Sequence, residues 1–151
     1  MPPQPTAAVC RLIEQIETRF HEGHRRAFGP LRAQGAAAGP ELAAEMQQLF
    51  TALEQHMFKE EMRLFPMMQQ GGNRLIVQLI DDLHADHADH GAAMAALCGR
   101  LQALAADPAR AAALQPLQQG LQALASELAL HIQAEEAQLF PMFLPAAAPA
   151  R

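Results

Sequence analysis

The sequence contains no tryptophan and no tyrosine, and it has only two cysteines in 151 residues. Cys10 and Cys98 lie far apart, which argues against a disulfide framework and against the closely spaced cysteine pairs of cysteine-based zinc sites. Each is therefore expected to be a small packing residue. Without tyrosine and tryptophan, the chain also lacks a side chain that could act as a stable radical partner.

Positive charge and long apolar runs are scarce as well. The 11 lysine and arginine residues are outnumbered by 16 acidic residues, which gives a formal net charge of −5 without any basic cluster. This argues against a nucleic-acid-binding surface. No apolar run is long enough to cross a bilayer, and the N-terminus lacks the pattern of a signal peptide. We expect a soluble cytoplasmic protein that binds neither nucleic acid nor membrane.

Residues that favour helix formation dominate the composition of the chain. Leucine, alanine, glutamine and glutamate recur along the whole chain, whereas β-branched residues are scarce. This balance favours helices over strands, and the chain length suits one domain with a full core. We therefore expect an all-α fold.

Breakers and periodic hydrophobic residues divide the chain into four helices. Thr6, Asn73 and Asp107 are expected to cap the first, third and fourth helices, and Pro40 suits the first turn of the second. The first should stop near Gly29–Pro30 and the second at Gly71–Gly72, while Pro116 can delay the start of the fourth. Because the connections are short, we expect an up-down-up-down antiparallel four-helix bundle. Residues 1–151 would form a single domain, with the bundle over 6–143 and a frayed tail over 144–151.

The second and fourth helices each place a glutamate on a hydrophobic face. At about 100° per residue, Glu60 lies about 20° and Glu135 about 15° from the centre of its apolar stripe. One turn earlier stands a histidine, His56 in one helix and His131 in the other. The surrounding stretches HMFKEEMRLFPMM and HIQAEEAQLFPMF start 75 residues apart (131 − 56), which indicates an internal repeat. The two apolar stripes consist of Leu42, Met46, Leu49, Leu53, Leu64 and Met67, and of Leu117, Leu121, Leu124, Leu128 and Leu139.

Two ionised carboxylates in one interior need compensating positive charge. Each would cost several kcal/mol if buried without a partner. The inward-facing positions contain no lysine or arginine, so a bound cation is the remaining source of that charge.

The first and third helices supply further histidines. His87 and His90 lie on the stripe of the third helix, and either His21 or His24 faces inward from the first. The third stripe is expected to comprise Leu75, Leu79, Leu83, His87, His90, Met94, Leu97 and Leu101. A histidine and a glutamate one turn apart can reach the same ion or adjacent ions.

Four imidazoles and two carboxylates suit two metal ions better than one. Each ion would take two terminal imidazoles, share both carboxylates and an oxo or hydroxo bridge, and keep an open position for a small molecule. Ferritin-like di-iron sites instead use four carboxylates and two histidines. With fewer anionic ligands, strong oxidative chemistry is not expected. Two iron ions (Fe2+/Fe3+) fit this donor set best, and the alternatives are a single ion such as zinc, or no metal.

Four motifs in this order resemble the hemerythrin-like proteins, and most closely the C-terminal domain of the bacterial RIC (repair of iron centres) proteins. They are RFHEGHRR, HMFKEEMRLFPMM, DHADHGAAM and HIQAEEAQLFPMF, one in each expected helix. The resemblance covers nearly the whole chain and implies a hemerythrin-like bundle around a di-iron centre.

The resemblance also implies a set of ligands. Matched by motif, they are His21, His56, Glu60, His87, His131 and Glu135. The apolar stripe of the first helix consists of Val9, Ile13, Ile16 and Phe20. Only His21 disagrees with the periodicity, because it lies about 120° from the centre of this stripe, whereas His24 lies about 65° away. We adopt His21 as the ligand. His24 and His90 are kept as additional ligands or as residues that support a ligand.

Three functions are compatible with the resemblance. The first is a role in nitrosative or oxidative stress, in which the protein donates iron to damaged iron-sulfur clusters or handles nitric oxide. The second is an O2- or NO-binding or sensing module without turnover. The third is an NO or peroxide reductase, which would need an external electron donor because no cofactor motif is visible in the chain.

Two departures qualify the resemblance. Oxygen-carrying hemerythrins have H-x-x-x-x-D in the fourth helix and a further histidine four residues after the third-helix ligand, where this chain has Gly91. This favours the RIC-like variant. RIC proteins usually also have a short N-terminal domain with a vicinal cysteine pair, which has no counterpart in these residues. Any function of that domain is not expected here.

Overall fold

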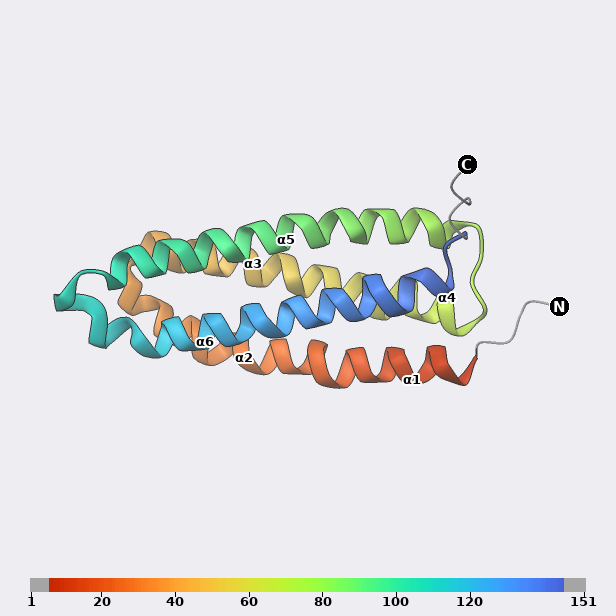
Figure 1. Cartoon of the computed structure of the whole chain (residues 1–151), viewed down its shortest axis with the longest axis horizontal. Coiled ribbons are helices and arrows are strands. Elements are labelled where there is room, and N and C mark those ends of the chain that lie inside the picture. The colour runs from red at the N-terminus through yellow and green to blue at the C-terminus, as the bar shows by residue number, and fades with distance from the viewer. Residues whose placement is uncertain (1–5, 146–151) are drawn as a thin grey trace, which may run out of the picture.

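The structure is a computed structural model, and it describes residues 6–145. Every regular element in this range is a helix and none is a strand, which confirms the expected all-α fold. The helices form four long rods that lie side by side (Figure 1). In chain order, the rods are α1 (Ala7–Gln15) with α2 (Glu22–Gly35), α3 (Pro40–Lys59) with α4 (Phe65–Gln69), α5 (Leu75–Ala105), and α6 (Pro108–Gln133).

Short segments of other helix types complete the rods. Three are π-helical: Ile16–His21 between α1 and α2, Glu60–Leu64 between α3 and α4, and Ala134–Leu139 after α6. Two are 3-10 turns, Ala36–Ala38 and Phe140–Met142. The chain therefore keeps winding through each π segment, and the direction in which later side chains point changes there.

Each rod packs against two neighbours around a common core. α2 contacts α3 and α6, and α5 contacts α3 and α6. The apolar core has two separate clusters along the bundle. One contains Phe28, Phe50 and Leu121, and the other contains Ile13, Phe65 and Phe140. A layer of buried histidine and glutamate residues interrupts the apolar interior.

The first rod continues past the expected stop at Gly29–Pro30. Pro30 lies inside α2, which ends only at Gly35 and is followed directly by the 3-10 turn Ala36–Ala38. Proline removes one helical hydrogen bond, but burial of Leu31 and Gly35 against neighbouring helices offsets this loss. Leu31 is only 3% exposed, and a side-chain carbon added at Gly35 would meet the sulfur of Met46 at 3.1 Å.

Two other sequence predictions need correction, and two caps agree. Pro116 does not delay the fourth helix, because α6 already begins at Pro108. At the start of α5 the inward residues are Ile76 and Ile80, whereas Leu75 is 61% exposed. Two expected caps are present, since Thr6 accepts from the Val9 amide at 3.3 Å and Asp107 accepts from the Ala109 amide at 3.0 Å. Asn73 accepts from the Leu75 amide at 2.9 Å, but it lies one residue before Arg74, the N-cap residue of α5.

The second rod ends just before Gly71 and Gly72, as the sequence predicted. Gly71 and Gly72 have φ angles of 97° and 84°, which residues other than glycine rarely adopt. The expected frayed tail, 144–151, lies outside the described residues except for its first two positions. Among the described helices, none is both long and apolar enough for a membrane crossing.

Gly120 permits the close approach of α6 to α2. A Cβ atom at this position would lie 2.6 Å from Cδ2 of the buried Leu31, whereas a Cβ at the exposed Gly99 of α5 would have no atom within 4 Å. Gly120→Leu should therefore lower the free energy of unfolding by about 1–3 kcal/mol relative to Gly99→Leu. Chemical denaturation of the two variants measures the difference, and equal stabilities would contradict the proposed close contact.

Candidate metal centre

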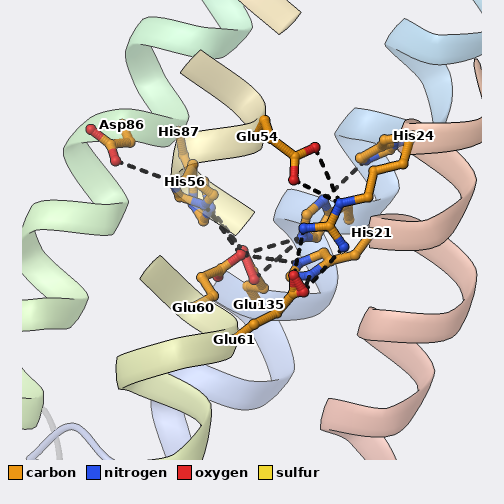
Figure 2. Close-up of polar contacts among 11 residues, drawn as sticks. His21, His24, Glu54, His56, Glu60, Glu61, Asp86, His87 and Glu135 are labelled. Carbon is orange, nitrogen blue, oxygen red and sulfur yellow. Dashed lines mark hydrogen bonds and ion pairs between the residues drawn. The ribbon is translucent and has the colours of Figure 1, made fainter. Parts of the chain in front are cut away.

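The polar layer lies near the middle of the bundle and draws on all four rods. Its residues are His21, His24, His56, Glu60, His87, His90, His131 and Glu135. None is more than 8% exposed. Figure 2 shows Glu60 and Glu135 in the middle, with His56 and His87 on one side and His21 on the other. The structure thus brings together every candidate residue that the sequence suggested.

The π segments explain why both first-rod histidines are buried. The expected angles assumed about 100° per residue throughout. The first rod contains the π segment Ile16–His21, where an extra residue enters the helical turn and changes the phase of the residues after it. His21 is 0% and His24 is 1% exposed as a result. Glu60 and Glu135 also lie in π segments, so three polar residues of this layer depend on a local departure from α-helix.

The side chains form two groups that could each hold a metal ion. One group is His21, Glu60, His131 and Glu135; the other is His56, Glu60, His87 and Glu135. In each group, one potential ligand atom per residue lies within 4.8 Å of all the others. Both groups contain both carboxylates, whereas each contains a different pair of histidines. This sharing is what two adjacent ions bridged by two carboxylates would require.

Unpaired polar atoms show that the donor set fits a cation. Buried atoms without a hydrogen-bond partner among residues 6–145 include Nε2 of His56 and His131 and Oε2 of Glu60 and Glu135. Such orphaned groups are rare in protein interiors, because each costs desolvation energy. Imidazole nitrogens and carboxylate oxygens are ligands of iron and zinc. A metal would therefore satisfy the atoms that the protein leaves unpaired.

Three of the histidines have a partner on the ring edge that points away from the carboxylates. Nδ1 of His56 donates to Asp86 at 3.1 Å, and Nδ1 of His87 donates to Glu136 at 2.8 Å. Nδ1 of His131 is 3.1 Å from Nε2 of His24. Partners of this kind fix the tautomer and orientation of a metal-binding imidazole. The Nε2 atoms are consequently left to face Glu60 and Glu135.

An arginine-centred network lies behind His21. Oε2 of Glu61 is 3.7 Å from Nδ1 of His21. Arg25 donates to both oxygens of Glu61 and also donates through Nε to Glu54 at 2.8 Å. With both oxygens engaged by the guanidinium, Glu61 stays beside His21 rather than entering the centre.

His24 and His90 belong to neither group of four. His24 contacts His131 as described, on the α6 side of the centre. The ring of His90 meets the ring of His56 edge-on, with centroids 5.2 Å apart. Each therefore touches a histidine of a different group, which corresponds to the supporting role that the sequence left open for both.

Comparison with known proteins agrees with this geometry. The model of the Hemerythrin HHE cation binding domain family matches residues 12–143. The chain belongs to this family. Membership implies a cation-binding bundle, and the buried histidine and glutamate groups of this chain are able to bind metal.

Two curated relatives are proteins named for iron-sulfur cluster repair. The protein YtfE of Citrobacter koseri is 27% identical over 149 residues, which cover 92% of this chain and 68% of the relative. YtfE of Salmonella paratyphi B is 27% identical over 143 residues, covering 88% of this chain and 65% of the relative. The chain thus spans about two thirds of the length of these relatives. A comparison with solved structures gives no significant match.

The two buried carboxyls of this hemerythrin-family bundle do not ionise alike without metal. Burial raises the pKa of Glu60 well above its usual value, and the negative charge of Glu135 adds to the effect. Burial acts the same way on Glu135, but the charge of His131 and hydrogen bonds from Glu60 and His131 lower the pKa of that carboxyl overall. The pair therefore retains one proton, on Glu60, until a cation replaces it.

Burial also keeps several imidazoles neutral. It lowers the pKa of His21 to about 2, that of His24 to about 3 and that of His90 to about 4, with nearby histidines contributing in each case. His87 behaves differently: burial disfavours its charge, but Glu135 and Glu136 raise its pKa overall. Neutral imidazole is the form that binds metal, so the fold prepares His21 for that role.

Sequence reasoning missed the residues that hold the histidines in place. Asp86, Glu61 and Glu136 each follow or precede a candidate ligand by one position in the sequence. Arg25 gave no signal, because its partners Glu54 and Glu61 lie on a different rod. A search for acidic residues adjacent in sequence to the ligands could have found the first three.

The depressed pKa of His90 has a consequence for stability. In the unfolded chain this histidine protonates near pH 6.5, but in the folded chain it stays neutral down to about pH 4. The unfolded state therefore binds more protons as the pH falls below 6.5, and the folded state loses stability. Between pH 7.5 and 5.5, metal-free His90→Gln should lose about 1 kcal/mol less unfolding free energy than the metal-free wild type.

Urea denaturation of both proteins at the two pH values measures this difference. Comparing the change with pH, rather than the stability itself, cancels the titration of shared groups that do not interact with His90. The same pH dependence in both proteins would contradict a depressed pKa at His90.

Proposed function

We propose that this chain is a non-haem di-iron protein. His21 and His131 would bind one iron, His56 and His87 would bind the other, and Glu60 and Glu135 would contact both. The observation that carries the proposal is the presence of both carboxylates in both groups of potential ligands. A single-metal site would have no use for two histidine pairs on opposite sides of one carboxylate pair.

The bound irons would compensate the carboxylate charge and offer an open coordination position to a small molecule such as O2 or NO. The protein supplies the rest. Glu60 gives up its proton when the site fills, and the outer partners Asp86, Glu136 and His24 hold three imidazoles in position. The apolar clusters on both sides of the polar layer keep bulk water away from the centre.

The proposal extends to the architecture. The alternating direction of the four rods, expected from the short connections, is supported by the order of colours along the rods in Figure 1. One domain over residues 1–151 is likewise part of the proposal, since the family match covers 12–143.

The role that we propose is the supply of ferrous iron for the repair of iron-sulfur clusters under nitrosative or oxidative stress. Two relatives that cover most of this chain are named for cluster repair. The donor set supports release as Fe2+, because two carboxylates stabilise ferric iron less than the four carboxylates of a ferritin-like site would. Partners would then be damaged iron-sulfur proteins that accept the ion.

Binding of O2 or NO without turnover is the second candidate. A groove of about 330 Å3 between α2 and α6 favours it, because mostly apolar residues such as Ala27, Leu31 and Leu124 line it. His24 also lines the groove, and this residue contacts His131. A small uncharged molecule could approach the centre from this side.

Metal content tests the shared carboxylates. Glu60→Gln should reduce bound iron from about two ions per chain to about none, because glutamine offers no anionic bridge to either ion. His56→Ala should retain about one ion, since the other group keeps its four residues. Elemental analysis after anaerobic loading with Fe2+ measures both.

Glu41→Gln is the matched control, because Glu41 is an exposed glutamate in the first turn of the same helix as His56. It should bind as much iron as the wild type. If Glu60→Gln and His56→Ala retained equal amounts of iron, the two carboxylates would not bridge the ions.

Iron transfer separates the two candidate functions. Protein loaded with radiolabelled Fe2+ should pass the label to an apo iron-sulfur protein that is supplied with sulfide and a reductant. Glu60→Gln, mixed with the same total Fe2+, gives the background from free iron. Label that stays with the wild-type protein while NO binds stoichiometrically would reject iron donation and favour the binding module.

A further inference from the structure

A second groove reaches the polar layer from another side of the bundle. It lies between α3 and α5, has a volume of about 410 Å3, and is lined by His90 together with Asp89 and Leu97. His90 is only 8% exposed, and its ring contacts that of His56. The groove therefore ends one side chain away from a proposed iron ligand.

His90 has no partner that would explain its burial. Its Nδ1 atom is buried and makes no hydrogen bond to any described residue. An unpaired imidazole nitrogen in an interior carries a desolvation cost that calls for a ligand or another function. Imidazole nitrogen is a good ligand for ferrous iron. His90 is thus placed to bind a cation on its way between the groove and His56.

The charges around His90 favour a cation. Asp89 lines the groove and forms no ion pair within residues 6–145. Asp86 lies one turn before His90 on α5 and accepts from His56. The positive groups nearby are already engaged: Arg100 with Glu45 at the other end of the groove, and Lys59 with Asp86 at 3.8 Å. Asp89 remains as the unpaired carboxylate next to the buried imidazole.

The groove between α2 and α6 lacks these features. Its histidine, His24, is already paired with His131. Arg19 and Glu127, which also line it, neutralise each other in an ion pair at 3.2 Å. The two grooves therefore differ in chemistry: one offers an unpaired acid and an unpaired imidazole, and the other offers mainly apolar surface.

We propose that Asp89 and His90 form an outer binding site for Fe2+, through which iron enters and leaves the centre by way of His56. The ion keeps its oxidation state and only exchanges oxygen and nitrogen ligands along this path. The inference rests on the proposed iron site, because the path ends at it. The ion held by His56 and His87 would then exchange before the ion held by His21 and His131.

Blocking each groove tests the route. Ala93 and Ala123 are exposed alanines in the walls of the α3–α5 and α2–α6 grooves, respectively. Phenylalanine at either position narrows one groove and leaves the polar layer untouched. The measurement is the anaerobic rate at which a ferrous chelator such as bipyridine removes iron from the fully loaded protein.

Asp89→Asn should slow extraction by about tenfold, within the range that a charged cleft gives to association rates. Ala93→Phe should slow extraction as well, because the larger side chain narrows the groove. Equilibrium iron content should stay unchanged. Ala123→Phe and Asp81→Asn, the second of which removes an exposed carboxylate elsewhere on α5, should extract at the wild-type rate. His90→Leu should slow extraction as well, and should remove the difference in rate between the first and second ion.

The outcomes distinguish the two proposals. If the wild type holds iron and the chelator removes it from all variants at the same rate, the route is wrong but the iron site stands. The same holds if only Ala123→Phe slows the removal of iron. Wild type that holds no iron after anaerobic loading would overturn both. Slowing by Ala93→Phe, Asp89→Asn and His90→Leu, with full iron content in the first two and wild-type rates in Ala123→Phe and Asp81→Asn, would establish the outer site.

Discussion

The structure depends on the burial of Glu60 and Glu135 in one interior. Both side chains are fully buried, and neither forms an ion pair with a lysine or arginine of the described chain. Two adjacent carboxylates cannot both ionise there without positive charge. In the metal-free protein a proton on Glu60 relieves part of this repulsion. The surrounding imidazoles, with nitrogens that have no partner of their own, are arranged as though a cation takes over that task.

Support for these imidazoles comes from outside the centre. Asp86 and Glu136 accept from the far nitrogens of His56 and His87, whereas His131 is supported by the neutral ring of His24. The two halves of the centre are therefore not equivalent. One is backed by carboxylates close to α5, and the other by imidazole and by the Arg25–Glu61 pair. This difference gives a physical basis for unequal exchange or reactivity of two bound ions.

The apolar periodicity predicted most of the fold, and its failures have identifiable causes. Pro30 and Pro116 were read as breakers, but both lie inside helices whose buried neighbours, such as Leu31 and Leu117, stabilise continued winding. The start of α5 was placed out of phase because Leu75 and Ile76 are equally hydrophobic. Only packing against the neighbouring rods decides that Ile76 turns inward.

By itself, the sequence determined the helical class and the two repeated histidine–glutamate pairs, and it led to the expectation of a bound cation. These follow from composition and from spacing along a single helix. The sequence could not decide between His21 and His24, because that choice depends on a π segment which changes the phase of the first rod. The sequence also did not predict the ion pairs of Arg25 or which histidine lines which groove. Contacts between rods are set by the packing of residues far apart in the chain, and only the tertiary structure contains them.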